Sequence, residues 1–150
     1  METAETLKIL SDLVHTAEDG AKGFAEAADR TKDPELRMVF KECAMSCHAA
    51  VVDLQNELAT LGDDLAEGGT TGGAMHRAWI NLKSSLGGGD LGLLEDVERE
   101  EDRAKAQYLK ALRADLPASI RGVVETQCEG AVRNHDRIRD LRNQYRAGVA

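Results

Sequence analysis

The sequence predicts an all-α protein, and three observations lead to this fold class. The composition is 42% hydrophobic but only 3% aromatic, and alanine and leucine dominate it, which favours helices over sheets. Apolar residues recur at steps of three and four along four long stretches, which is the spacing of one helical face. The connection between the second and third stretches is far longer than a helical hairpin needs. A single domain of 150 residues built as a four-helix bundle is therefore expected.

Caps and breakers in the sequence predict where the helices begin and end. Four long helices, each with an apolar stripe, are expected over residues 5–30, 34–61, 90–114 and 117–146. Asp33 and Pro34 start the second helix, because aspartate caps a first turn and proline fits the first helical position. Gly62 ends it. Asp90 is expected to cap the third helix, and Pro117 breaks the chain before the fourth.

Glycines indicate how the helices connect and approach each other. Glycine clusters surround a short amphipathic helix expected over residues 74–86, with Trp79 as its anchor. The connection that contains it can travel the length of a long helix, so the second and third long helices can run parallel. This arrangement is typical of a bundle with one crossover. Within the first helix, Gly20 and Gly23 cost helix propensity, which predicts close approach of a neighbouring helix near the bundle centre.

Five acidic and histidine residues near the middle of the helices are candidate metal ligands. Glu98 and Glu101 lie on or beside the apolar face of the third helix, and a buried acid must be paired, metal-bound or protonated. Glu18 lies near the centre of the first helix, His48 at the edge of the second stripe and His135 on the fourth. The alternative is structural: His135 pairs with Glu98 or Glu101, and no metal is needed.

Four stretches of the sequence carry a resemblance to a known family. They are DPEL (33–36), HRAWINLK (76–83), LP (116–117) and HDRIR (135–139). Through them the whole chain resembles a bacterial family of uncharacterised proteins classed as ferritin-like four-helix bundles, a domain of unknown function. The resemblance implies a ferritin-like fold and a stress-related role, with no settled activity and no functional residues to carry over.

Metal-binding ferritin-like bundles usually carry one Glu on each of two helices and Glu-x-x-His on each of the other two. In this chain Met45 and Val132 occupy the Glu positions before His48 and His135. A complete di-iron carboxylate site is therefore not expected. The favoured hypothesis is a non-catalytic bundle that acts through assembly or a protein partner. The alternative is a degenerate site for iron, manganese or zinc.

Two further groups of residues have a structural and a functional interpretation. Cys43, Cys47 and Cys128 are expected to pack in the core as reduced thiols; the alternatives are a zinc site and a thiol redox sensor. His15 and Asp19 are expected on the solvated face of the first helix.

Charge and motifs exclude several classes of function. The net charge of −8 argues against nucleic acids and anionic membranes as partners, and leaves a homo-oligomer or a protein partner. Neither a secretory leader nor an apolar run near the length of a membrane span is recognised, so a cytoplasmic location is expected. No phosphate-binding loop, dinucleotide fingerprint or nucleophile arrangement is present, which favours a protein that is not an enzyme.

Overall fold

The computed structural model describes residues 3–62 and 89–148, and within them it is all-helical. Four helices are present in this part of the chain: α1 (Thr3–Arg30), α2 (Pro34–Thr60), α4 (Gly89–Leu112) and α5 (Ala118–Arg146). Their ends differ from the predicted ones by at most two residues, which is the usual uncertainty of helix boundaries. The short helix predicted over residues 74–86, with Trp79, lies outside the described residues.

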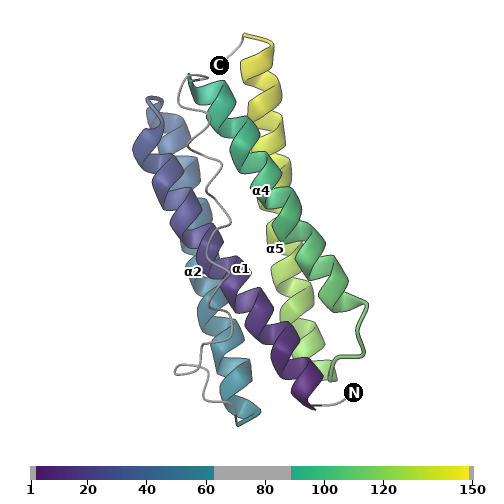
Figure 1. Ribbon diagram of the computed structural model, residues 1–150. Helices are drawn as coiled ribbons and strands as arrows, with labels where there is room; N and C mark the ends of the chain where they lie inside the picture. Colours follow the sequence, from purple (N-terminus) through teal and green to yellow (C-terminus); the bar gives the residue numbers. More distant parts are fainter. Residues whose placement is uncertain (1–2, 63–88, 149–150) are drawn as a thin grey trace.

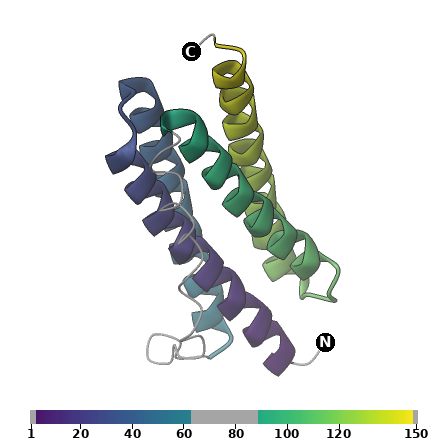
Figure 2. The same cartoon turned by 45° about the horizontal axis from the view of Figure 1, so that its top comes forward.

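The helices form two antiparallel hairpins, α1 with α2 and α4 with α5, which pack side by side (Figure 1). Helix α1 contacts α4, and α2 contacts α5. The hydroxyl of Thr31, in the turn before α2, donates a hydrogen bond of 2.8 Å to the carboxylate of Asp90 at the start of α4. The starts of α2 and α4 therefore lie at the same end of the bundle, and both helices run toward the opposite end (Figure 2). None of these helices is both long and apolar enough to cross a bilayer.

The predicted caps of α2 are confirmed, whereas that of α4 is wrong. Asp33 Oδ1 accepts a hydrogen bond of 2.8 Å from the backbone N–H of Glu35, and Gly62 follows α2 with a φ of +82°. Asp90 lies inside the first turn of α4, which begins at Gly89. Its carboxylate does not cap the helix because it accepts hydrogen bonds from the turn between α1 and α2 instead.

The apolar core is divided into two clusters. One cluster, around Phe24, Phe40 and Leu94, fills the end where α2 and α4 begin. The other, around Leu10 and Leu58, fills the opposite end. The clusters form because the apolar stripes of all four helices face the bundle axis, and burial of each large side chain stabilises the fold by about 1.5–3 kcal/mol.

Helices α1 and α2 approach closely between the two clusters. A Cβ atom added to Gly20 would lie 2.8 Å from Cys47 Sγ, closer than two such atoms can pack. The close approach predicted from Gly20 is thus confirmed, and it positions Cys47 at the middle of the bundle.

Candidate functional site: a cavity at the middle of the bundle

A cavity of about 930 Å³ lies at the middle of the bundle, and all four helices line it. Small side chains from each helix contribute to its wall: Ala17 and Gly20 from α1, Ala50 from α2, Ala104 from α4 and Ala131 from α5. Because these side chains are short, they leave room where larger residues would close the core. The volume lies within the range of small-molecule sites.

Glu101 on α4 lines this cavity and is only 3% exposed. Its Oε1 atom has no hydrogen-bond partner among the described residues. Burial, with a smaller contribution from the negative charge of Asp102, raises the pKa of the Glu101 carboxyl from 4.5 to about 8. These surroundings therefore hold the acid mainly in its protonated form at neutral pH. Of the two acids predicted on or beside the apolar face of α4, Glu101 lines the cavity, and Asp96 and Glu100 of the same helix are buried as well.

The three cysteines are free thiols, and Cys43 and Cys47 lie close enough to Glu101 to be affected by its charge. Burial, and then the negative charge of Glu101, raises the pKa of the Cys43 thiol to about 12. The same two causes raise the pKa of Cys47. Cys128 is buried on α5, and burial raises its pKa as well. Because the thiolate is the reactive form, these shifts argue against a redox sensor and agree with packing.

Tyr108 and Gln127 form a hydrogen-bonded chain across the cavity wall. The Tyr108 hydroxyl donates to Gln127 Oε1 over 3.0 Å, and Gln127 Nε2 donates to the carbonyl of Ala50 over 3.2 Å. This chain connects α4, α5 and α2 and satisfies the polar atoms that take part in it. Glu101 Oε1 in contrast receives no donor from the described residues.

The charged residues of the wall differ in depth. The buried ones among the described residues are all acids, namely Asp19, Glu100 and Glu101. The basic ones are exposed, namely Lys8, Arg103, Lys110 and Arg133. Arg103 lies 3.1 Å from Glu100, and Lys8 lies 3.0 Å from Asp12. The deep part of the cavity is therefore acidic and its rim is mixed.

The expectation that Asp19 and His15 are solvated is wrong. Asp19 is 9% exposed, the His15 side chain is 13% exposed, and both line the cavity. The reason is that α1 packs against both α2 and α4, so that it buries a wider arc than its apolar stripe covers.

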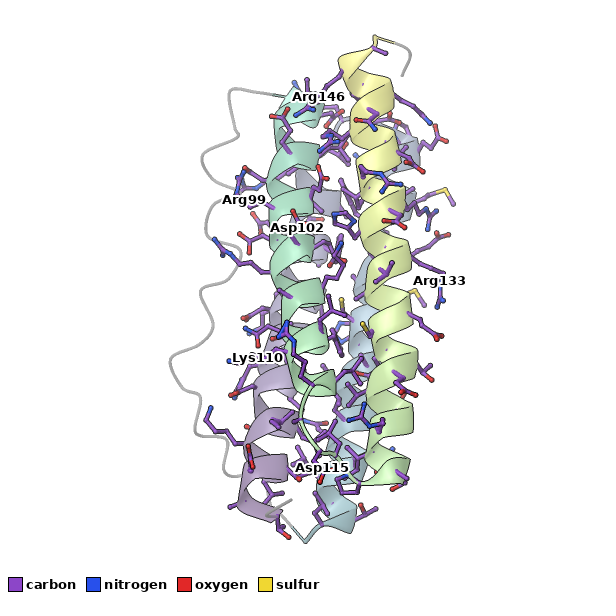
Figure 3. The ribbon with its side chains drawn as sticks, turned by 90° about the vertical axis from the view of Figure 1, so that its right-hand side faces the viewer. Arg99, Asp102, Lys110, Asp115, Arg133 and Arg146 are labelled. Carbon is purple, nitrogen blue, oxygen red and sulfur yellow. The ribbon has the colours of Figure 1, made fainter. Side chains whose placement is uncertain are left out.

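His135 pairs with acids of α4, and the nearest of them is Asp102 rather than the predicted Glu98 or Glu101. His135 Nε2 lies 2.7 Å from Asp102 Oδ1 and 3.7 Å from Glu98 Oε2. Glu98 also forms an ion pair with Arg142. Figure 3 looks onto the face formed by α4 and α5, where Asp102 is labelled. Contacts between these two helices thus already use two of the candidate ligands.

The remaining candidate ligands lie elsewhere. Glu18 is partly exposed on α1, 3.5 Å from His15, and His48 is exposed on α2. His48 follows the cavity residue Cys47 by one position, which turns it about 100° around the helix. Within residues 3–62 and 89–148, no group of three or more His, Cys, Asp or Glu residues is placed to hold a metal ion. Of the predicted ligands Glu18, His48, Glu98, Glu101 and His135, the structure brings Glu98 and His135 together, and the five do not form one site.

A protein-family model described as Domain of unknown function (DUF2383) matches residues 5–114. None of the curated proteins compared with the chain matches it. The matched region contains α1, α2 and α4, and with them Glu101, whereas His135 on α5 lies outside it. Because the match spans more than two thirds of the sequence, the chain belongs to the DUF2383 family.

Proposed function

We propose that this protein is a non-catalytic, ferritin-like bundle that binds a small molecule in the cavity at its middle. The observation that carries the proposal is Glu101, a buried residue that lines the cavity and whose Oε1 atom has no hydrogen-bond partner among the described residues. A buried polar atom without a partner costs about 1–3 kcal/mol. A fold that keeps such a group beside a cavity, with a strongly shifted pKa, is a candidate binding site.

The order and direction of the helices support the ferritin-like assignment. Helices α2 and α4 begin at the same end, which requires a long connection between them, as in bundles with one crossover. In that group the functional site lies in the bundle core between facing helices. The cavity of this protein likewise lies between residues of all four described helices. Two of the predicted metal ligands already have partners, since Glu98 pairs with Arg142 and His135 contacts Asp102. This supports the binding of a small molecule rather than an iron, manganese or zinc centre.

Thermal unfolding in the presence of small molecules tests this function. The probes are 1-butanol, n-butylamine and butyrate. The Tm is measured with each probe for the wild type and for two variants that carry a substitution on α4. Ala104→Leu fills the cavity, whereas Ala106→Leu adds the same side chain at an exposed position. At least one probe should raise the Tm of the wild type and of Ala106→Leu, and not that of Ala104→Leu. If no probe raises the Tm, or if Ala104→Leu responds fully, the protein is not a binding bundle of this kind.

Elemental analysis tests the metal alternative. The protein would be expressed in medium with added iron, manganese and zinc, together with Glu101→Gln and the double variant Glu101→Ala, His135→Ala. We expect less than stoichiometric metal in all three. If the wild type contains near-stoichiometric metal and the variants do not, the protein has a metal centre and the proposal is wrong.

A stripe of exposed apolar residues on α2 favours association with a second copy as an additional function. Met38, Met45 and Val52 are 64%, 70% and 54% exposed, and they recur every seven residues. Seven residues is the period of a helix–helix seam, and these three side chains fill one position of it.

Sedimentation equilibrium tests the association. The wild type should form dimers at micromolar concentration, and Met45→Glu should shift it to monomers, because a charge in an apolar seam is costly. Gln144→Glu, an exposed change of equal charge on α5, serves as the control and should leave the dimer intact. A monomeric wild type would refute the seam.

A further inference from the structure

The charges around the cavity indicate the sign of its ligand. Among the described residues, every buried charged side chain of the wall is an acid, and the bases stay exposed at the rim. Glu100 has Arg103 as a partner at 3.1 Å, whereas the Oε1 atom of Glu101 has none. The neighbouring charge that acts on Glu101 most is Asp102, which has the same sign. Among the described residues, a positively charged group is therefore the complement that Glu101 lacks.

Small side chains from three of the helices supply apolar surface to the wall. Ala17, Gly20, Ala104 and Ala131 offer only methyl groups and backbone. Cys47 adds a thiol whose pKa is raised by burial, so it stays neutral. A short aliphatic chain fits such a surface, because burial of each methylene group contributes about 0.8 kcal/mol.

We propose that the ligand of the cavity is an organic ammonium ion with a short aliphatic chain, bound through its N–H groups to the Glu101 carboxylate. This inference rests on the proposed function, since it names the ligand class of the same site. An ammonium group supplies several donors to one acceptor, and its hydrogen bonds to a carboxylate are stronger than those between neutral groups. The aliphatic chain lies among the small residues contributed by the four helices.

Other ligand classes fit these residues less well. A divalent metal ion needs more ligating groups than the described residues bring together. An anion would meet three buried acids. A neutral alcohol can donate to the Glu101 carboxyl group, but it brings no positive charge to the carboxylate form of this residue.

Binding of an ammonium ion by a carboxylate also predicts the release of a proton. With its pKa at about 8, Glu101 carries a proton near pH 7 and gives it up when the cation binds. The other titratable groups around it are Asp102 and Tyr108 on α4, Cys43 and Cys47 on α2, and His15 and Asp19 on α1. Arg133 is the charged wall residue of α5 and is exposed.

Isothermal titration calorimetry at pH 6.5 tests the inference with n-butylammonium, 1-butanol and butyrate as probes. Each titration is repeated in phosphate and in ACES, two buffers with different protonation enthalpies, so that released protons are counted. We expect n-butylammonium to bind about tenfold more tightly than 1-butanol, with about one proton released per ligand. Butyrate should bind least.

Two variants with the same substitution, glutamate to glutamine on α4, separate the site from its surroundings. Glu101→Gln should lose both the preference for the ammonium ion and the proton release. Glu98→Gln lies one helical turn away, outside the described wall of the cavity, and should behave like the wild type. Equal affinity for 1-butanol and n-butylammonium would overturn the ammonium assignment and leave a binding cavity. Failure of all three probes would overturn the proposed function as well, and an unchanged Glu101→Gln would overturn the role of Glu101.

Discussion

Replacement of Glu101 by glutamine should change how the stability of the protein depends on pH. The pKa of this carboxyl group is about 8 in the folded protein, against 4.5 for a fully solvated glutamate such as that of the unfolded chain. Between these values the folded protein holds a proton that the unfolded chain releases. The free energy of unfolding must therefore fall as pH rises from 4.5 to 8.

The size of this effect follows from the difference between the two pKa values. Each pKa unit corresponds to about 1.4 kcal/mol, so Glu101 alone lowers the free energy of unfolding by about 5 kcal/mol across this range. Glutamine has nearly the same shape and does not titrate. We expect Glu101→Gln to have nearly wild-type stability at pH 5 and to be several kcal/mol more stable than the wild type at pH 8.5.

Urea unfolding followed by circular dichroism from pH 5 to 9 measures this difference. Glu125→Gln, an exposed acid on α5, is the matched control and should follow the wild-type curve. If the curves of Glu101→Gln and the wild type run parallel, then Glu101 is ionised and has a partner in the folded protein, and the reasoning is refuted.

Three further changes have definite expected outcomes. The change in the free energy of unfolding caused by Gly20→Ala should be about 1–3 kcal/mol more favourable in a Cys47→Ala background than in the wild type, because the added Cβ meets Cys47 Sγ. A double-mutant cycle of urea unfolding measures this coupling, and additive effects of the two substitutions would contradict it. Gly122→Ala should raise stability by about 1 kcal/mol, since nothing lies within 4 Å of the added Cβ on α5, and a lower Tm would show otherwise. Tyr145→Phe should raise the pKa of Asp33 toward its usual value, because the Tyr145 hydroxyl donates a hydrogen bond that lowers it; an unchanged carboxyl titration by NMR would exclude this bond in solution.

The helices could be predicted from the sequence because their signals are local. The cap formed by Asp33 and Pro34, the end at Gly62 and the apolar stripes depend on residues a few positions apart, and the structure confirms them. Asp90 looked like a cap for the same local reason. A hydrogen bond from Thr31, distant in sequence, takes its carboxylate instead.

The depth of polar residues could be predicted only in part, because it depends on which neighbours a helix has. Glu98 and Glu101 both lie at the edge of the α4 stripe, and the sequence does not tell which of them points inward. Helix α5 supplies Arg142 to Glu98, and no described residue donates to Glu101 Oε1. Asp19 is buried because α1 has two neighbouring helices, a fact that the α1 stripe alone does not contain.

The division of the core into two apolar clusters has a consequence for how the family can diversify. The ends of the bundle supply most of the buried apolar surface, around Phe24 and Phe40 at one end and Leu10 and Leu58 at the other. Substitutions in the layer between the clusters contact few of these side chains. Their effects on the free energy of unfolding should therefore be additive with the effects of substitutions at the ends. Selection can thus alter the size and charge of the middle layer while both ends keep the fold, so that one scaffold can evolve to accept different ligands.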